Sequence, residues 1–222
     1  MPDDSKATDA PRPSSDVAFT ASVKAIQERR GSRRRYQRLE AKGGFRQSIT
    51  PDLIAFLAER NSFYLATSNA EGQPYIQHRG GPKGFLSVLD EHTLGFADFG
   101  GNQQFITLGN LADNPRAFIF AMDYAQRRRV KLWGRARVVA DDPALLERLA
   151  DPAYPGKPEQ AILFAVEAWD INCPQHIPQL VAIADVLPVV ERLEARIREL
   201  EAMLALRTGS APNNPDGSNR SG

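Results

Sequence analysis

Short runs of β-branched and aromatic residues, separated by turn residues, dominate the middle of the chain and constrain its fold more than any other feature. Residues 62–68 (SFYLATS) and 74–78 (PYIQH) flank the turn Asn69-Ala70-Glu71-Gly72, which is the pattern of a β-hairpin. Similar runs occupy residues 85–89, 93–97, 117–122, 130–140 and 161–170. About six short strands with few helices between them predict a closed or nearly closed antiparallel barrel.

Two short helices are expected beside these strands. Thr50-Pro51-Asp52 has the sequence of a helix start, with Thr at the N-cap, Pro at the first helical position and an acid in the first turn. Residues 105–112 form the second predicted helix. It ends before Asn114-Pro115, because a residue that precedes proline avoids the helical region.

The C-terminal part of the chain has a different periodicity. Its apolar residues are spaced alternately three and four positions apart, as in a heptad seam: Val190, Leu193, Ile197, Leu200 and Leu204. Glu194 also precedes Arg198 by four positions, a spacing that supports a helix. We therefore expect a helix that packs either on its own barrel or on a partner chain, and the sequence favours neither arrangement.

The two ends of the chain are rich in Pro, Ser, Asp, Asn and Gly and are expected to be disordered. Near the N-terminus, Val17, Val23 and Ile26 recur at roughly helical spacing, which predicts that residues 16–42 are helical. The expected organisation has five parts: a disordered tail (1–15), a basic helical segment (16–49), the barrel (50–178), a heptad-patterned helix (179–207) and a second disordered tail (208–222).

The basic segment concentrates positive charge, although the net charge of the whole chain is only +1. Its cations are Arg29, Arg30, Arg33, Arg34, Arg35, Arg38 and Lys42. A solvated helix face is the ordinary explanation of such a cluster. Binding to DNA or RNA is the alternative, and the segment lacks the interleaved aromatic residues, beyond Tyr36, that would favour it.

The single cysteine, Cys173, rules out an internal disulfide framework, which suits a reducing compartment. Residues 1–16 contain no apolar core of a secretory signal, and no run approaches the roughly 18 apolar residues of a membrane helix. We therefore expect a cytoplasmic protein with no membrane partner.

Metal and nucleophile chemistry have little support in the sequence. Zinc requires three or four protein ligands, and the chain offers one Cys and three His, so no metal site is expected. Cys173 is expected to be a buried cysteine beside a turn proline rather than a nucleophile. The alternative for this segment is that His176 or Trp169 lines a ligand pocket.

Several common catalytic motifs are missing. No G-x-G-x-x-G follows a strand, and neither G-x-x-x-x-G-K-[ST] nor G-x-S-x-G occurs. A dinucleotide-binding fold, nucleotide hydrolysis and serine hydrolase chemistry therefore lack their usual sequence signals.

Residues 50–140 resemble pyridoxamine 5'-phosphate oxidase-like flavoproteins, and the resemblance continues less clearly to His176. Its motifs occur in the family's order: the leading helix, FYLATSNAEGQPYIQ, HRGGPKGF, VLD with TLGF, GN before a helix with LGNL, NPR, and VKLWGRA. The resemblance implies a mainly β fold, a six-stranded split β-barrel that binds FMN, with flanking helices and here a long C-terminal helix. It also implies a homodimer, in which two FMN molecules lie in grooves between the subunits.

The same resemblance implies which residues contact FMN. A cofactor site of this kind needs cations and backbone N–H donors for the phosphate, and Arg79 stands beside two glycines where the backbone can approach a ligand. Gly101-Asn102 leads toward a helix N-terminus, where phosphate binds favourably. The family positions carried over are Arg79, Asn102, Gln103, Arg129 and Lys131, with the neighbours Gly80, Gly81, Asp98, Thr107, Gly109 and Asn110.

Two departures argue against oxidation of vitamin B6. The oxidase places an Arg-Lys pair at the helix start where this chain has Asn102, Gln103 and Gln104, and its substrate-binding C-terminal segment is missing here. We therefore expect an FMN-dependent oxidoreductase that acts on another small molecule, with a possible reductase partner and no identified catalytic side chain. The alternative is a dimeric module that binds flavin or haem without turnover.

Overall fold

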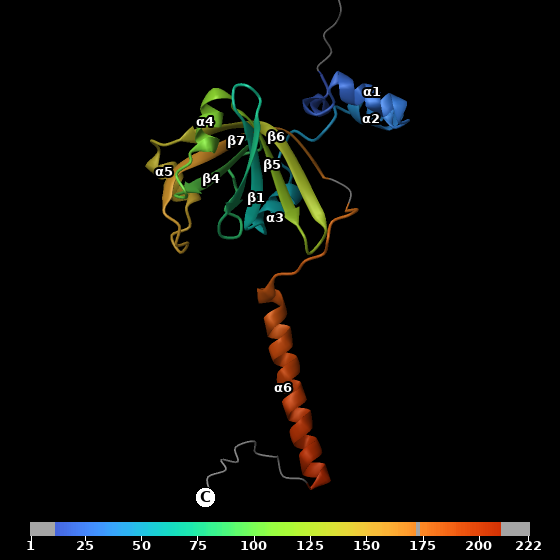
Figure 1. The fold of residues 1–222 in the computed structure, drawn as a ribbon, viewed down its shortest axis with the longest axis vertical. Coiled ribbons are helices and arrows are strands. Elements are labelled where there is room, and N and C mark those ends of the chain that lie inside the picture. The colour runs from blue at the N-terminus through green and yellow to red at the C-terminus, as the bar shows by residue number, and fades with distance from the viewer. Residues whose placement is uncertain (1–11, 172–173, 210–222) are drawn as a thin grey trace, which may run out of the picture. The chain divides into compact units, whose positions relative to one another are not determined.

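The computed structural model describes residues 12–171 and 174–209, and it divides into two compact units with a boundary between Ile177 and Pro178. The first unit contains every strand and all but one of the described helices, and the second contains the remaining helix, α6. Figure 1 shows the first unit as a strongly curled sheet with short helices around it.

The sheet has seven strands, not six, and every pairing in it is antiparallel. The strands are β1 (Ser62–Ser68), β2 (Pro74–Gly80), β3 (Ser87–Val88), β4 (Thr93–Phe99), β5 (Arg116–Asp123), β6 (Arg128–Val139) and β7 (Pro158–Ile171). Their order across the sheet is β2-β1-β5-β6-β7-β4-β3. The predicted hairpin is confirmed as β1 and β2, and the additional strand is the two-residue β3.

The sheet curls far enough to bring β2 close to β4, but these two strands are not paired through their backbones in the described residues. Side chains cross the seam instead: Arg79 of β2 forms an ion pair with Asp98 of β4. The expectation of a closed barrel is therefore not confirmed, and the structure is an open, curled sheet with a seam between β2 and β4.

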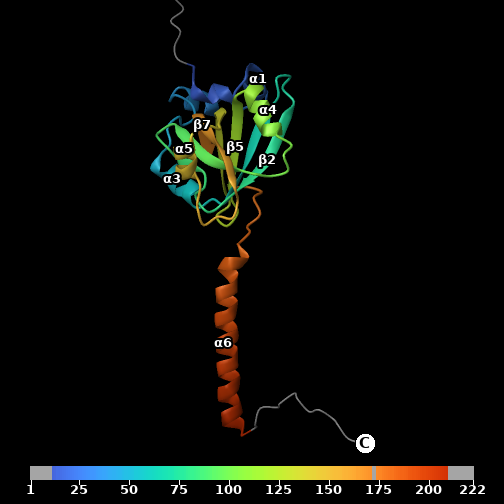
Figure 2. The same cartoon turned by 90° about the vertical axis from the view of Figure 1, so that its left-hand side faces the viewer.

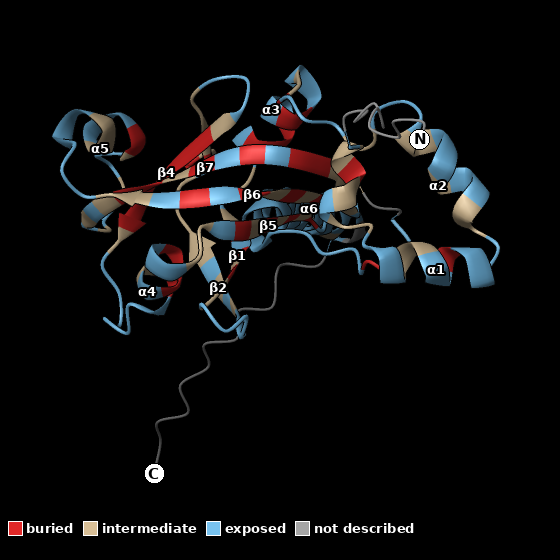
Figure 3. Cartoon of the chain, turned by 90° about the horizontal axis from the view of Figure 1, so that it is seen from above, coloured by how far each residue is buried: buried red, intermediate tan, exposed pale blue. Residues whose placement is uncertain are grey.

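The core lies inside the curl and follows the alternation of the strands. In β5 every second residue is buried, and Figure 3 shows the same alternation of buried and exposed residues along β6 and β7. Leu65, Ile119, Leu132 and Phe164 have no exposed surface. Each such side chain contributes about 1.5–3 kcal/mol by leaving water, so the core stabilises the curl that positions the seam.

Three short helices flank the sheet: α3 (Pro51–Ala58), α4 (Ile106–Asp113) and α5 (Pro143–Leu149) (Figure 2). The predicted start of α3 is confirmed, with Thr50 at the N-cap position. The Thr50 hydroxyl, however, donates to the Asp52 carboxylate and does not accept from a backbone N–H. Burial of Leu53 and Leu57 on one face holds α3 against the core.

The N-terminal segment forms a short 3-10 helix, η1 (Ser14–Val17), and two α-helices, α1 (Ala21–Arg29) and α2 (Arg33–Glu40). The expectation that residues 16–42 are helical is confirmed, but the helical structure is divided between separate helices. The break lies at Gly31, whose φ of 74° is in the left-handed region that glycine adopts without a steric penalty. An aromatic contact then anchors the segment, because the Phe45 ring stacks on Trp133 of β6 with centroids 5.2 Å apart.

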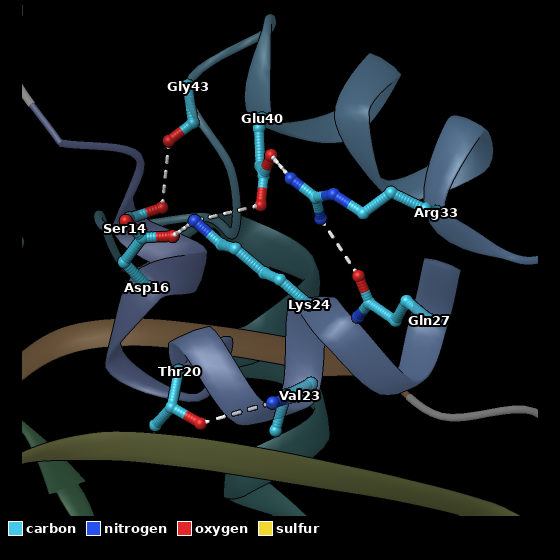
Figure 4. Close-up of polar contacts among 9 residues, drawn as sticks. All are labelled: Ser14, Asp16, Thr20, Val23, Lys24, Gln27, Arg33, Glu40 and Gly43. Carbon is cyan, nitrogen blue, oxygen red and sulfur yellow. Dashed lines mark hydrogen bonds and ion pairs between the residues drawn. The ribbon is translucent and has the colours of Figure 1, made fainter. Parts of the chain in front are cut away.

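A polar network joins these N-terminal helices, as Figure 4 shows. The Lys24 ammonium lies 2.6 Å from Asp16 and 3.4 Å from Glu40, and Arg33 pairs with Glu40 and donates to Gln27. The hydrogen bond to Asp16 is the largest cause that raises the pKa of Lys24 above its ordinary value. Part of the basic cluster therefore serves the local fold.

The second unit contains one long helix, α6 (Ile183–Thr208), which confirms that the heptad-patterned residues are helical. Pro188 lies inside this helix, near its beginning. Among the described residues, no helix combines the length and the low charge that crossing a bilayer requires.

Candidate functional site

A cavity opens at the seam between β2 and β4, beside the start of α4. Its volume is about 60 Å³. The predicted residues Arg79, Asp98, Asn102, Gln103 and Thr107 meet here. The full lining comes from β2, β4, α4 with the loop before it, and β7: Tyr75, Gln77, Arg79, Asp98, Phe99, Gly101, Asn102, Gln103, Gln104, Phe105, Ile106, Thr107, Leu108, Glu159 and Gln160.

Arg79 is the only cation of this lining, and its side chain is 13% exposed. One guanidinium nitrogen pairs with Asp98, whose second carboxylate oxygen accepts from Gln160 at 3.0 Å. The Nε atom of Arg79 is buried and has no hydrogen-bond partner in the described structure. Arg79 is thus oriented by a carboxylate while it keeps one unsatisfied donor, a costly arrangement unless another group accepts from it.

The loop before α4 forms the opposite side of the cavity. Gln103 and Phe105 both have positive φ values, 58° and 54°, in the left-handed region that few residues other than glycine adopt. Such backbone strain is found most often at ligand sites. The Asn102 side chain accepts from the Gln104 N–H at 3.3 Å, which is a local turn and not a helix cap.

The start of α4 itself is uncapped. Helix α4 begins at Ile106, four residues after Asn102, and its N-cap residue Phe105 makes no side-chain hydrogen bond to it. Asn102 therefore precedes α4 and does not cap it. The first N–H groups of any helix have no acceptor within the helix, and here the residues that carry them line the cavity. The positive end of the helix dipole faces the space beside Arg79.

Two side chains of α4 hold it against the sheet. The Thr107 hydroxyl donates to Gln77 of β2 at 2.7 Å, and the Asn110 amide donates to the Thr67 hydroxyl of β1 at 3.0 Å. Asn110 is buried and does not line the cavity, so the structure gives it a role in packing. Gly109 lies on the same helix, where an added Cβ would meet no atom within 4 Å.

The two glycines after Arg79 have different surroundings. Gly80 lines a second hollow of about 160 Å³ together with His78, Phe85 and Phe96. Gly81 lies against the Phe85 ring, which a Cβ at Gly81 would approach to 2.6 Å. The absence of a side chain at Gly81 therefore allows Phe85 to pack into the core.

Arg129 and Lys131 are not brought to this cavity within one chain. Both lie on β6, where they pair in register with Met122 and Phe120 of β5. Lys131 forms an ion pair with Asp170 at 3.4 Å, and the Nε atom of Arg129 is buried without a partner in the described structure. Neither residue lines the cavity at the seam.

The remaining candidates of the C-terminal strand region do not line the cavity either. Trp169 is buried in the core, where its indole N–H donates to the Ser48 carbonyl at 2.8 Å. His176 has a positive φ of 62°, and Cys173 lies outside the described residues. Within residues 12–171 and 174–209, no three His, Cys, Asp or Glu side chains are grouped to hold a metal ion.

Sequence reasoning missed several residues of the lining. Tyr75 and Gln77 could have been predicted from Arg79, because the two-residue period of a strand places all three side chains on one face of β2. Glu159 and Gln160 could not be found in this way, because they come from the distant strand β7.

A larger hollow of about 730 Å³ lies on the outer side of the sheet. It is lined by Asp16, Val17, Ala66, Thr67, Ser68, Gly72, Pro74, Arg116, Ala117, Phe118, Trp133, Gly134 and Glu167. Its size falls within the roughly 300–1,000 Å³ of ordinary ligand pockets, whereas the cavity at the seam is far smaller. The seam cavity alone could therefore enclose only one end of a cofactor.

Comparison with known proteins identifies one family. Its sequence model, described as pyridoxamine 5'-phosphate oxidase, matches residues 49–173. No curated protein sequence matches the chain.

Solved structures match only part of the chain, at low identity. HupZ of Group A Streptococcus is 19% identical, with 60% of this chain and 99% of that chain covered and a TM-score of 0.47. For a putative pyridoxamine 5'-phosphate oxidase from Lactobacillus delbrueckii the identity is 22%, the coverages are 56% and 95%, and the TM-score is 0.44. For HutZ, the haem storage protein from Vibrio cholerae, the identity is 16%, the coverages are 55% and 94%, and the TM-score is 0.38.

Proposed function

The chain belongs to the pyridoxamine 5'-phosphate oxidase family, and on this premise we propose that it is a flavoprotein that binds FMN. The flavin, when bound, supplies hydride or electron transfer, so the protein acts as an FMN-dependent oxidoreductase on a small molecule. The side chains of the protein bind and orient the cofactor and select the substrate.

The observation that carries this proposal is the cavity beside Arg79. The guanidinium of Arg79, held by Asp98, lines the same small space as the uncapped N-terminus of α4. Positive charge and backbone N–H groups without an acceptor are the features that bind a phosphate. Asn102, Gln103 and Thr107 line this space and offer further hydrogen-bonding groups.

The charge of the cavity limits what a single chain can do. Arg79 is the one cation among the lining residues, against the carboxylates of Asp98 and Glu159. A dianionic phosphate therefore needs more positive charge than one chain supplies at this point. This balance agrees with the small volume of the cavity in favouring a site completed by other residues.

A second copy of the chain is the source that we propose for this charge. Arg129 and Lys131 lie on β6, away from the lining of the cavity, and the buried Nε of Arg129 lacks a partner in the described structure. In a homodimer with shared sites, these residues of one subunit reach the flavin that is held by Arg79 of the other.

Substrate choice is separate from cofactor binding in this proposal. The chain has Asn102, Gln103 and Gln104 where the vitamin B6 oxidase has an Arg-Lys pair. We therefore propose a small-molecule substrate other than a B6 vitamer, with electrons delivered by a nicotinamide cofactor or by a reductase partner.

Two matched arginine variants test where FMN binds. Arg79→Ala removes the cation of the seam cavity, whereas Arg116→Ala removes the cation of the larger hollow on the outer side of the sheet. A charge-assisted contact to phosphate is worth roughly 1.5–3 kcal/mol, so Arg79→Ala should weaken FMN binding about 10- to 100-fold. Arg116→Ala should leave it unchanged, as measured by quenching of flavin fluorescence.

The opposite pattern would contradict the proposed site. Unchanged FMN affinity in Arg79→Ala, with a loss in Arg116→Ala, would move the cofactor to the outer hollow. Wild-type protein that holds FMN but is neither reduced by NADH or NADPH, alone or with a reductase, nor reoxidised by an acceptor would instead be a non-catalytic binding module.

A further inference from the structure

Helix α6 carries an apolar stripe along most of its length. With Val190 as the first position (a) of a heptad, the other a positions are Ile183, Ile197 and Leu204, and the fourth positions (d) are Val186, Leu193, Leu200 and Arg207. These side chains are largely exposed in the single chain, with Leu193 at 58% and Ile197 at 54%. A contiguous exposed stripe of this kind marks an interaction surface.

The residue types along the stripe indicate how two such helices would pair. The a positions before Leu204 are all β-branched, namely Ile183, Val190 and Ile197, whereas the central d positions are both leucine. β-branched residues at a with leucine at d favour two parallel strands over three or four. Pro188 falls at the outward-facing sixth position (f), so its ring lies outside the contact between the two helices.

The charges beside the stripe are complementary to a second copy of the same helix. Arg196 occupies the seventh position (g), and Glu201 occupies the fifth position (e) of the next heptad. In a parallel pair these two positions of opposite helices lie side by side, so Arg196 meets Glu201 of the partner subunit, and symmetry repeats the contact. An antiparallel pair would place e positions together and bring Glu194 near the partner's Glu201, which is repulsive.

A membrane surface does not suit the same stripe. Helices that lie on anionic bilayers carry an excess of Lys and Arg on their polar face. The polar residues of α6 include four arginines, but they also include five acidic residues: Asp185, Glu191, Glu194, Glu199 and Glu201. Two of the arginines already pair within the helix, Arg196 with Glu199 at 2.6 Å and Arg198 with Glu194 at 3.9 Å.

We propose that α6 pairs with α6 of a second copy of this chain as a parallel, in-register, two-stranded coiled coil. The pair has a twofold axis along its length, which is compatible with a symmetric dimer. It joins two chains independently of any contact between their curled sheets, and it raises the effective concentration of one sheet near the other. The proposal does not depend on flavin binding.

Disulfide trapping in the full chain tests the pairing. In a Cys173→Ser background, Leu193→Cys places a thiol at a d position, and Leu206→Cys places one at the outward third position (c), where the native side chain is 85% exposed. In-register parallel helices bring d positions of two chains within disulfide distance, but keep c positions apart. Mild oxidation should therefore cross-link most Leu193→Cys chains, as seen on a non-reducing denaturing gel. Leu206→Cys chains should run on the same gel without a cross-link.

Other outcomes of the trapping experiment overturn the proposal. If neither variant cross-links, α6 packs on its own sheet or on another partner. If both cross-link equally, the helices collide without forming a defined pair.

A charge exchange tests the parallel orientation in the same assay. In the paired helices, Arg196→Glu places a glutamate beside Glu201 of the other chain at both symmetric contacts. This repulsion should lower the initial cross-linking rate of the Leu193→Cys chain about fivefold. Adding Glu201→Arg restores the opposite charges only in a parallel pair and should return the rate to its original value. Failure of the double exchange to restore the rate would contradict the parallel arrangement.

Discussion

Replacement of Asp98 by asparagine separates the structural pairing of Arg79 from its proposed role in binding an anion. The Arg79 and Asp98 side chains are only 13% and 9% exposed, so the ion pair is nearly buried. Removing one partner of a buried pair costs roughly 3–5 kcal/mol, since a charge is left without its counterion. Asparagine keeps an acceptor oxygen, so we expect the lower end, about 3 kcal/mol.

Thermal unfolding of the FMN-free protein measures this loss. For a protein of this size the expected destabilisation lowers the melting temperature by roughly 6–12 °C. The exposed pair Lys83–Glu59, at 3.3 Å, provides the control. Both of its side chains are more than half exposed, so Glu59→Gln should change the melting temperature little.

Added FMN then distinguishes the two roles of Arg79. If its phosphate binds beside Arg79, it replaces the carboxylate that Asp98→Asn removes, so FMN should raise the melting temperature of the variant more than that of the wild type. A smaller rise in the variant would mean that Asp98 itself helps to hold the cofactor. Unfolding of the FMN-free variant at the wild-type temperature would refute the energetic role of the pair.

Two further predictions concern the fold away from the cavity at the seam. Gly134→Ala should lower the free energy of unfolding by about 1–3 kcal/mol in denaturant unfolding, because the new Cβ would overlap the Ala165 carbonyl oxygen. Gly101→Ala is the control and should be nearly neutral, since a Cβ there meets no atom within 4 Å. Equal effects of the two substitutions would contradict the close approach of Gly134 to Ala165. The Thr50 hydroxyl is the largest cause that holds the pKa of Asp52 below its ordinary value, so Thr50→Val should raise that pKa in an NMR titration. Because the folded pKa is lowered, Asp52 stabilises the fold at neutral pH and this contribution is lost as the pH falls through that pKa; an unchanged pKa in the variant would show that Thr50 is not the cause.

Local sequence signals predicted the elements whose structure is decided locally. The β1–β2 hairpin and the start of α3 follow from turn residues and from Pro51 at the first helical position. Helix α5 carries the same kind of signal, with Asp142 as a side-chain N-cap before Pro143, and it could have been predicted from it. The break between α1 and α2 depends on one glycine, Gly31, at a positive φ.

The site was predictable only in part, because its geometry depends on contacts between distant segments. The motifs of the family resemblance pointed to Arg79 and to the loop around Asn102. The alternation of side chains along a strand could also have indicated Gln77. The pairing of Arg79 with Asp98 requires the sheet to curl until β2 faces β4, and no local pattern encodes that curl. The left-handed conformations of Gln103 and Phe105 likewise arise from the loop's surroundings, since neither residue favours them.

The most direct test of the proposed function is the visible spectrum of the purified wild-type protein, read together with its mass in solution and the identity of the molecule released by boiling. The proposal predicts a yellow dimer that releases one FMN per chain, or a colourless dimer that takes up added FMN to that ratio. A protein that neither contains flavin nor takes up FMN would contradict it, and a monomer that binds FMN fully would contradict the shared site.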